Sequence, residues 1–463
     1  MSVRTLLVGM LLSLEDGRPA HLTRVHACLI GLPEKEQRRL GVLVQWRSGS
    51  HLLTYRQVER TFGLVCDALS KAVPDGTPSL ELCQVVDDLL EASVPERYKN
   101  QSSSVAVDWT DIETFAKRPV KDGKSKDKEA SWGHRAGEGP AGSDEIFFGY
   151  YLQGATTVRQ ERGPAVPELA RRMLLTTCRK DPVPAFVPVL ERMHNSGIAV
   201  GDVLADSAYG YRSPENWAAP LRAIGAKLVQ DMHPGDRGRK GTYKGAIISN
   251  GNLYCPATPV PLLELGPVSR DCSKDQLSEH DNKTALLSAY KLGRITAYDQ
   301  DGYHRVMCPA AMGKIRCPHR RDSMTLSLAK PEVLQAPEPA PTCCTQKTVT
   351  VPVQVCLKTA QKHDYPSKAH RQSYKRRTGA ERTFASIKDP ARNDISKGWC
   401  RVMGVAPMTL FLACLFVTRN LRTTDTFERR RANALSKASK EYTRPKRRKT
   451  LADMAAASAG PPP

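Results

Sequence analysis

The order of secondary-structure signals between residues 104 and 232 limits the chain to a mixed α/β fold more strongly than any other feature does. Three β-rich runs come first, and two helical patterns then alternate with two further strands. The strands are expected at residues 104–111, 146–158, 168–178, 200–210 and 227–232, the fourth running into a turn, and the helices at 184–197 and 213–226. Strands that alternate with amphipathic helices predict a mixed sheet flanked by helices.

The sequence on either side of this segment divides the chain into further regions. Helical patterns such as residues 53–73 and 79–94 predict an N-terminal helical domain. After residue 232, short strands or loops punctuated by Pro, Gly and Cys predict a β-rich insertion with one helix near 281–291. Helical character then returns, and a basic C-terminal tail is expected to be disordered. The expected regions are 1–98 for the N-terminal helical domain, 99–232 with 371–425 for the α/β domain, 233–370 for the insertion and 426–463 for the tail.

The composition predicts a polyanionic partner. The formal net charge is +21 over 463 residues, and nucleic acid is the first expectation for such a chain. The best apolar run, residues 408–417, falls short of the roughly 18 residues that span a bilayer, so no membrane partner is expected. The apolar residues 6–14 imitate part of a signal peptide, but acidic residues follow them without a cleavage motif. Thirteen cysteines at irregular spacing fit reduced intracellular thiols better than a disulfide framework.

The stretch SYKRRTGAERTFASIKD, residues 373–389, contains a single glutamate, Glu381, among Lys and Arg residues. Its apolar spacing predicts a helix beyond Gly379. If the helix is continuous, four side chains fall within about 60° of one another, at about 100° per residue: Tyr374, Arg377, Glu381 and Lys388. One interpretation is a surface helix whose glutamate pairs with neighbouring cations. The other is a carboxylate kept ionised by those cations for a chemical purpose.

Two predicted strands carry an aspartate where their apolar run finishes. Asp108 follows Val105 and Val107, and Asp206 follows the run at 203–204. Such residues serve as turn formers or helix caps, or they present a carboxylate at the rim of a sheet, where ligands bind in α/β folds. Asp111 competes with Asp108 for the second interpretation, and Asp108 is favoured because it directly ends the apolar run.

Asp108, Asp206 and Glu381 together have the composition of a two-metal phosphoryl-transfer site. Carboxylate oxygens suit Mg²⁺ or Mn²⁺. Two such ions about 3.5–4 Å apart can activate an attacking oxygen and stabilise a leaving one. In a basic chain, this combination favours an enzyme that acts on the phosphodiester backbone of nucleic acid.

These motifs resemble those of the DDE transposases of bacterial insertion sequences. One subgroup of that family carries Tyr, two residues, Arg, three residues, Glu, six residues and Lys around its catalytic glutamate. Tyr374, Arg377, Glu381 and Lys388 match this spacing without a gap. The segment VLADSAYGY, which contains Asp206, is similar to the family's second-aspartate motif, and VAVDWTD fits the first by pattern.

The resemblance covers about residues 104–421 and implies a ribonuclease H-like catalytic domain, with a β-rich insertion between the second aspartate and the glutamate. It implies that Asp108, Asp206 and Glu381 are the catalytic residues and hold two Mg²⁺ or Mn²⁺ ions. The implied activity is metal-dependent DNA cleavage and strand transfer at the ends of an insertion sequence.

The resemblance also implies partners and further roles. Arg377 and Lys388 would hold DNA phosphates near the cleaved bond, and Tyr374 would stack or hydrogen-bond there. Residues 1–98 are expected to bind the DNA ends on family architecture alone. The implied partner is double-stranded DNA, which includes the terminal inverted repeats and the target DNA. The protein is expected to bind it as a homodimer and to be cytoplasmic and associated with the nucleoid.

Two other functions and a second metal remain open at this point. One alternative is a transposase-derived DNA-binding protein without activity, and another is a nuclease on the same fold. The cysteines and histidine of the insertion suggest structural Zn²⁺, but they lack a CxxC pair, and buried or free thiols are the competing interpretation. The residues concerned are Cys255, Cys308, Cys317, His319, Cys343 and Cys344.

Overall fold

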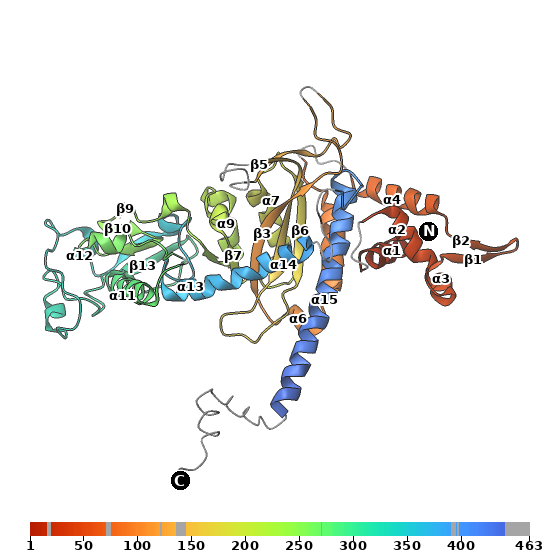
Figure 1. The fold of residues 1–463 in the computed structure, drawn as a ribbon. Helices are drawn as coiled ribbons and strands as arrows, with labels where there is room; N and C mark the ends of the chain where they lie inside the picture. The colour runs from red at the N-terminus through yellow and green to blue at the C-terminus, as the bar shows by residue number, and fades with distance from the viewer. Residues whose placement is uncertain are drawn as a thin grey trace, which may run out of the picture.

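The protein is a mixed α/β molecule whose central sheet has helices packed against it (Figure 1). The computed structural model describes residues 1–15, 20–70, 76–120, 123–135, 145–269, 271–389, 395 and 398–439. Within these residues, the N-terminal helices and the segment between β8 (Lys227–Gln230) and α13 (Lys368–Tyr374) lie at opposite ends of the molecule, with the central sheet between them (Figure 1).

The central sheet joins strands in the order β4-β5-β3-β7-β8, and β6 pairs with the second half of β5. Strands β3, β7 and β8 are parallel, whereas β5 is antiparallel to its three neighbours. The sheet strands are β3 (Ser104–Glu113), β4 (Ser131–Arg135), β5 (Glu145–Thr157), β6 (Ala170–Thr177), β7 (Asp202–Ala205) and β8 (Lys227–Gln230). The mixed sheet and the five strands expected between residues 104 and 232 are therefore confirmed, whereas β4 lies in a polar stretch for which no strand was expected.

Alternate residues of β3 face two different cores, as the period of a strand requires. Val105 and Val107 pack in one buried core with Phe186 of α7, and Ala106 packs in another with Ala380 of α14 (Thr378–Lys388). The elements on the α7 side are α7 (Pro182–Asn195), α8 (Ser207–Gly210), η2 (Pro214–Asn216) and α9 (Ala218–Ala223). Asp181 caps α7 by accepting a hydrogen bond from the Val183 amide. The helices predicted at 184–197 and 213–226 are thus present, the second as a short 3-10 turn followed by α9.

The long helix α15 (Val405–Ser439) supplies much of the main core. Asn420 lies at the edge of β6, where its side chain accepts from the Ala170 amide and donates to the Ala170 carbonyl, at 2.9 and 2.8 Å. Helix α15 is the one helix in the described part of the chain that is long and apolar enough to cross a membrane. Of its most apolar 18-residue stretch, 83% is buried inside the protein. Burial of that extent is typical of a core helix.

Residues 426–439 continue α15, in contrast to the disorder predicted from residue 426 onward. Adding turns to a helix already fixed by packing costs little compared with starting one. Ion pairs also support this part of α15, because Glu428 contacts Arg97 at 2.8 Å and Arg429 contacts Asp425 at 2.9 Å. Residues 440–463 lie outside the described part of the chain.

The N-terminal region is helical except for one hairpin. Its elements are α1 (Val3–Glu15), α2 (Leu22–Ile30), α3 (Glu34–Leu40), β1 (Leu43–Trp46), β2 (Gly49–Leu52), α4 (Tyr55–Leu69), α5 (Leu80–Ala92) and α6 (Glu96–Lys99). These helices share one core with α15, where the Phe62 ring lies 5.7 Å from the Phe411 ring. Ion pairs join α5 to β6; in one of them the buried guanidinium of Arg171 lies 2.7 Å from the carboxylate of Glu91. The region therefore packs directly on the α/β part of the chain.

The segment between β8 and α13 forms two three-stranded antiparallel sheets, β9-β10-β11 and β12-β13-β14, separate from the central sheet. Its elements are η3 (Pro234–Asp236), β9 (Arg239–Tyr243), β10 (Ala246–Ser249), β11 (Asn252–Tyr254), α10 (Val260–Leu263), α11 (Lys274–Tyr290), β12 (Gly293–Arg294), β13 (Tyr303–Met307), η4 (Arg321–Thr325), α12 (Thr342–Thr345), β14 (Val349–Pro352) and η5 (Val353–Cys356). Helix α11 begins seven residues before the predicted helix at 281–291, where Ser273 and Gln276 form a capping box.

Candidate active site

Asp108 lies on β3 where this strand extends beyond β7. The parallel pairing of β3 with β7 ends at Ala106, so Asp108 stands on an edge that β7 does not cover. Asp108 ends the apolar run but not the strand, because β3 continues to Glu113, two residues beyond the expected end at 111. The reason is the pairing on the other side, where β5 hydrogen-bonds along β3 as far as Glu113.

Asp206 directly follows β7 and is the first residue before α8. Its Oδ1 accepts a hydrogen bond from the Ala208 amide at 3.0 Å, which is the capping role expected of an aspartate in this position. Its Oδ2 is left to face Arg377. Asp206 therefore caps α8 with Oδ1, and it presents Oδ2 at the edge of the sheet, where a ligand could bind.

Glu381 lies on α14 (Thr378–Lys388), which the chain reaches through α13 (Lys368–Tyr374) and the 3-10 turn η6 (Lys375–Arg377). The helix predicted beyond Gly379 is present, but the condition of a continuous helix from Tyr374 onward is not met, because the tighter turn at η6 changes the rotation between Tyr374 and Glu381. Ala380 is buried against the sheet in the core that contains Ala106. This packing fixes the face of α14 from which Glu381 projects.

The guanidinium of Arg377 contacts all three carboxylates. Its Nη2 lies 3.3 Å from Asp108 Oδ2 and 3.5 Å from Asp206 Oδ2. Its Nη1 donates to Glu381 Oε1. The Arg377 side chain is only 12% exposed, whereas the Glu381 side chain is 50% exposed. The structure thus brings together the three acidic residues predicted from sequence, and it does so around one cation.

The electrostatics of this cluster show an excess of negative charge. The pKa of Asp108 is raised to about 6, mainly by burial; the charge of Arg377 opposes this shift, and the charges of Asp206 and Glu381 contribute to it. Burial also raises the pKa of the fully buried Tyr209 well above its ordinary value, and the charges of Asp108 and Asp206 add to this effect. Additional positive charge near Asp108 would stabilise its ionised form.

Asp111 belongs to a different group of charges. Its carboxylate pairs with Arg135 at 2.5 Å and with Lys388 at 3.5 Å. Although burial raises its pKa, the hydrogen bond from Arg135 and the charge of Lys388 bring that pKa below its ordinary value. Three residues along a strand reverse the side-chain direction, so Asp111 does not share the face of Asp108. This geometry supports the choice of Asp108 over Asp111.

Tyr374 and Lys388 do not join the Arg377 cluster as direct partners. Tyr374 packs against the core of Ala106 and stacks on His370, with ring centroids 5.9 Å apart. Burial raises the pKa of Tyr374 to about 12. Lys388 reaches Asp111, with its ammonium group partly exposed. Their predicted roles in DNA binding stay predictions.

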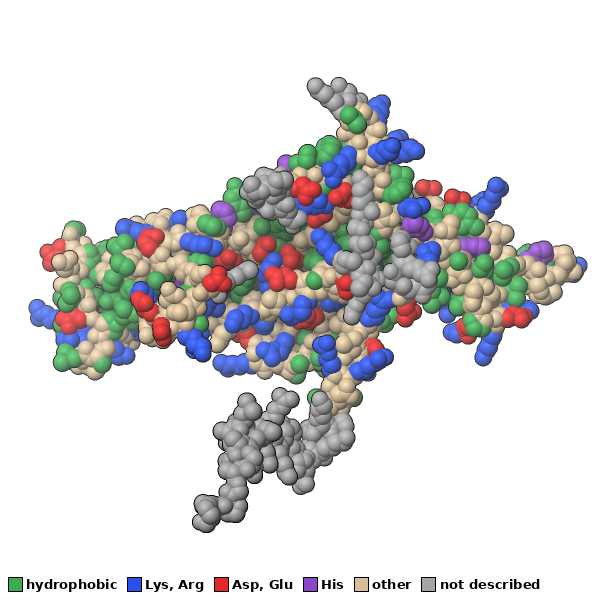
Figure 2. Space-filling view, in the orientation of Figure 1, with side chains coloured by type: hydrophobic (Ala, Val, Ile, Leu, Met, Phe, Trp, Pro, Cys, Tyr) green, Lys and Arg blue, Asp and Glu red, His purple; other side chains and the backbone are tan. Residues whose placement is uncertain are grey.

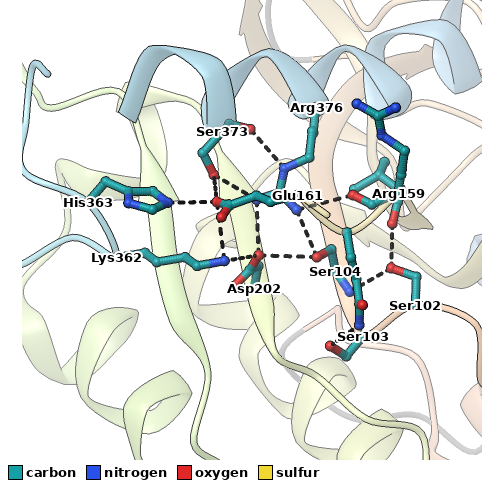
Figure 3. A network of polar contacts seen from close by, with 12 residues as sticks. Ser102, Ser103, Ser104, Arg159, Glu161, Asp202, Lys362, His363, Ser373 and Arg376 are labelled. Atoms are coloured by element: carbon teal, nitrogen blue, oxygen red, sulfur yellow. Dashed lines mark hydrogen bonds and ion pairs between the residues drawn. The ribbon is translucent and has the colours of Figure 1, made fainter. Parts of the chain in front are cut away.

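A buried polar network next to this site was not predicted from the sequence (Figure 3). Arg376 is at its centre and contacts Asp202 at 3.0 Å and Ser104 Oγ at 2.8 Å. Burial raises the pKa of Glu161, but hydrogen bonds from Ser373, His363 and Lys362 outweigh this effect and lower that pKa to about 2. The network contains Ser104, Glu161, Asp202, Lys362, His363, Ser373 and Arg376.

This network fixes the turn that carries Arg377. It ties η6 to the start of β7 through Arg376, whose side chain is 8% exposed. The next residue, Arg377, then points to the carboxylates at the other end of β7. No local sequence pattern identifies the network, because its members come from five separate parts of the chain.

The carboxylate cluster has the donor chemistry for Mg²⁺ or Mn²⁺, which prefer carboxylate oxygens. Among the described residues, however, no three or more His, Cys, Asp or Glu side chains are grouped closely enough to hold a metal ion. The oxygens of Asp108, Asp206 and Glu381 are instead directed to Arg377. The residues therefore fit a divalent cation on condition that Arg377 gives way to it.

The cysteines of the insertion lie in two buried cores. Cys255, Cys308 and Cys317 belong to one core, and Cys343 and Cys344 to the other. Burial raises the pKa of the Cys255 thiol to about 12, which favours the protonated form. This agrees with a buried thiol at Cys255, whereas a hydrogen bond with Cys343 lowers the pKa of Cys344 to about 7. Zinc at these residues stays a prediction.

The histidine that stacks on Tyr374 gives the protein a measurable acid sensitivity. His370 Nε2 lies 3.0 Å from the Gln230 carbonyl, and burial lowers the pKa of His370 to about 4. The unfolded chain, with a histidine pKa near 6.5, binds the proton more tightly. The free energy of unfolding therefore falls as the pH drops from about 6.5 to about 4.

We expect His370→Gln to remove this part of the acid sensitivity. The parent should lose on the order of 2 kcal/mol more stability than the variant between pH 7 and pH 4.5. Urea unfolding at a series of pH values measures the difference. His194→Gln, a substitution at an exposed position of α7, serves as the control and should follow the parent. Parallel pH profiles for the parent and His370→Gln would show that this histidine is not buried in the neutral form.

Comparisons with known proteins do not assign a family to this chain. No protein-family model and no curated protein matches it. Among solved structures, a chain of the Drosophila P element transposase strand transfer complex aligns with it at a TM-score of 0.24 and 11% sequence identity. The alignment covers 87% of this chain and 93% of that chain. A TM-score this low does not establish a common fold, so the argument for function depends on the carboxylate cluster itself.

Proposed function

We propose that the protein is a DDE transposase, which cleaves DNA strands at the ends of an insertion sequence and joins them to target DNA with divalent metal ions. The observation that carries the proposal is the meeting of Asp108, Asp206 and Glu381, from three separate elements, at the guanidinium of Arg377. The sheet supports it, because three antiparallel strands followed by two parallel ones are typical of a ribonuclease H-like fold.

Asp108, Asp206 and Glu381 would hold Mg²⁺ or Mn²⁺ in this proposal. When bound, the ions supply activation of the attacking oxygen and stabilisation of the leaving oxygen. The protein positions the three carboxylates and balances their negative charge. Strand β3, the cap of α8 and helix α14 hold the three carboxylates, and Arg377 balances their charge before metal binds. The predicted contact of Arg377 with DNA phosphate requires its guanidinium to leave these carboxylates.

The other parts of the chain have proposed roles around this site. We assign end recognition to residues 1–98 and assign residues 233–370 to an insertion subdomain outside the central sheet. Tyr374 and Lys388 lie beside the cluster and are proposed to contact DNA near the cleaved bond. A homodimer on double-stranded DNA with terminal inverted repeats is the proposed active form.

A cleavage assay on native flanking DNA tests the proposed function. The substrate is a plasmid that carries the coding region with the DNA on both sides of it, incubated with the purified protein and Mg²⁺, Mn²⁺ or EDTA. We expect strand breaks at two defined positions outside the coding region with either metal ion, and none with EDTA. A control plasmid without the flanking DNA should stay intact.

The other outcomes select the alternative functions. Metal-dependent breaks that appear equally in the control plasmid indicate a nuclease on the same fold. Binding to the flanking DNA without breaks in either metal indicates a DNA-binding protein that has lost activity. Both results contradict the proposed function.

A further inference from the structure

Two adjoining clefts lie along the side of α14 away from the carboxylate cluster. Their volumes are about 760 and 540 Å³, and they share Val166, Glu168 and Arg382. The first extends to α13 and the second to α15. On the face shown in Figure 2, Lys and Arg side chains gather below α13 and α14 and beside α15.

The lining of these clefts carries a large excess of positive charge. Eight Lys and Arg side chains line them, compared with two carboxylates, Glu161 and Glu168. Both carboxylates already have cationic partners. Glu168 pairs with Arg382, and Glu161 accepts from Lys362, His363 and the neighbouring groups of the buried network. Three of the eight cations are engaged within the protein, because Arg376 and Arg382 form ion pairs and Arg422 donates to the Glu15 carbonyl. The cations that remain for an external anion are Arg159, Arg162, Lys375, Arg419 and Arg430.

Arg419 is the most unusual side chain of the second cleft. It is only 6% exposed, and its Nη1 donates to the backbone carbonyl of Glu168. Its Nε has no hydrogen-bond partner, and within the described part of the chain it makes no ion pair. Burial lowers the pKa of Arg419 to about 10, the charge of Glu168 opposes this shift, and the charge of Arg382 adds to it. Because Glu168 forms its direct ion pair with Arg382, Arg419 has only a partly compensated charge, and a buried charge of this kind is costly unless a further anion balances it.

We propose that the two clefts bind consecutive phosphate groups of a DNA backbone, at a surface distinct from the carboxylate cluster. The proposal rests on the proposed function, because it adds a DNA-binding surface to the same enzyme. Glu381 and Arg382 are adjacent on α14, where side chains of consecutive residues diverge by about 100°. Glu381 contacts Arg377 while Arg382 contacts Glu168, so one DNA strand can lie across α14 and reach both surfaces.

A DNA backbone fits these clefts better than a small anion does. The cationic lining runs through two clefts and comes from the loop after β5, from α13 to α14 and from α15. A single phosphate would meet only part of this lining. A chain of phosphates spaced along a strand would meet all of it, and binding would release the counterions that the strand carries.

Substitutions at the exposed rims of the clefts test this proposal. Arg162→Gln and Arg430→Gln change exposed lining residues, whereas Arg429→Gln changes an adjacent exposed arginine that does not line the cleft and pairs with Asp425. The probe is a fluorescent duplex taken from the DNA that flanks the coding region, and its affinity is measured in EDTA over a salt series. Each cleft substitution should lower the slope of log K against log salt by about one, and the control should not change it.

Two outcomes would overturn the proposal. If Arg162→Gln and Arg430→Gln keep the slope of the parent while the parent binds and cleaves DNA, the clefts are not DNA contacts, and the proposed function still stands. If inorganic phosphate stabilises the parent against heat and Arg419→Met abolishes this effect, while the DNA slopes stay unchanged, the clefts are a small-anion pocket. A parent that neither binds nor cleaves the flanking DNA contradicts the proposed function itself.

Discussion

Replacing Asp108 by Asn, Asp206 by Asn or Glu381 by Gln is expected to reduce DNA strand cleavage at least about 10³-fold, or about 4 kcal/mol of transition-state stabilisation. Each substitution keeps the shape of the side chain and removes one of the three charges that meet at Arg377. DNA affinity measured in EDTA should stay close to that of the parent. The measurement is a nicking assay paired with a mobility-shift assay on the same flanking DNA.

Asp111→Asn is the matched control, because Asp111 lies on the same strand but pairs with Arg135 and Lys388 instead. It should keep its cleavage activity. Full activity in any of the three cluster variants would remove that residue from the site. A loss in Asp111→Asn as large as that in Asp108→Asn would transfer the role of first aspartate to Asp111.

Arg377→Met is expected to destabilise the metal-free protein by about 3 kcal/mol, because it leaves Asp108 and Asp206 without their shared cation. Divalent metal should compensate for the loss. The stabilisation by Mn²⁺ should be larger in the variant than in the parent, since the ion no longer competes with the guanidinium. Urea unfolding in EDTA and over a Mn²⁺ series measures both effects without any assay of activity.

Arg382→Met provides the comparison on the same helix. Arg382 makes an ion pair with Glu168 at a largely exposed position, and such pairs contribute about 1 kcal/mol or less. This variant should respond to Mn²⁺ as the parent does. An equal response of Arg377→Met and the parent to Mn²⁺ would show that the carboxylates do not take up the ion where Arg377 lies.

The parts of the fold that could be predicted from sequence are those set by local pattern. Strands β5 and β6 and helix α7 follow from hydrophobic periodicity, and all three are present at the expected residues. Asp206 was placed correctly because the end of β7 and its capping turn lie within a few residues of it. The same local information identified Glu381 on a helix.

The features that sequence did not predict depend on contacts between distant residues. Strand β3 continues past its expected end at residue 111 because β5 pairs with it as far as Glu113, some forty residues later in the chain. The turn η6 is held by Arg376 through Asp202, and the two residues are 174 positions apart. Helix α15 extends beyond residue 426 from a core that the N-terminal helices complete. Such contacts leave no periodic signal in a single sequence.

Anomalous X-ray diffraction from crystals of the protein with Mn²⁺ and flanking DNA tests the central claim most directly. The account predicts anomalous density among the carboxylates of Asp108, Asp206 and Glu381, with the Arg377 guanidinium displaced from them. Crystals of Asp108→Asn grown in the same way should show weaker density or none. Anomalous density elsewhere, or three carboxylates still bound to Arg377 at saturating Mn²⁺, would contradict the claim that these residues form a metal-dependent catalytic site.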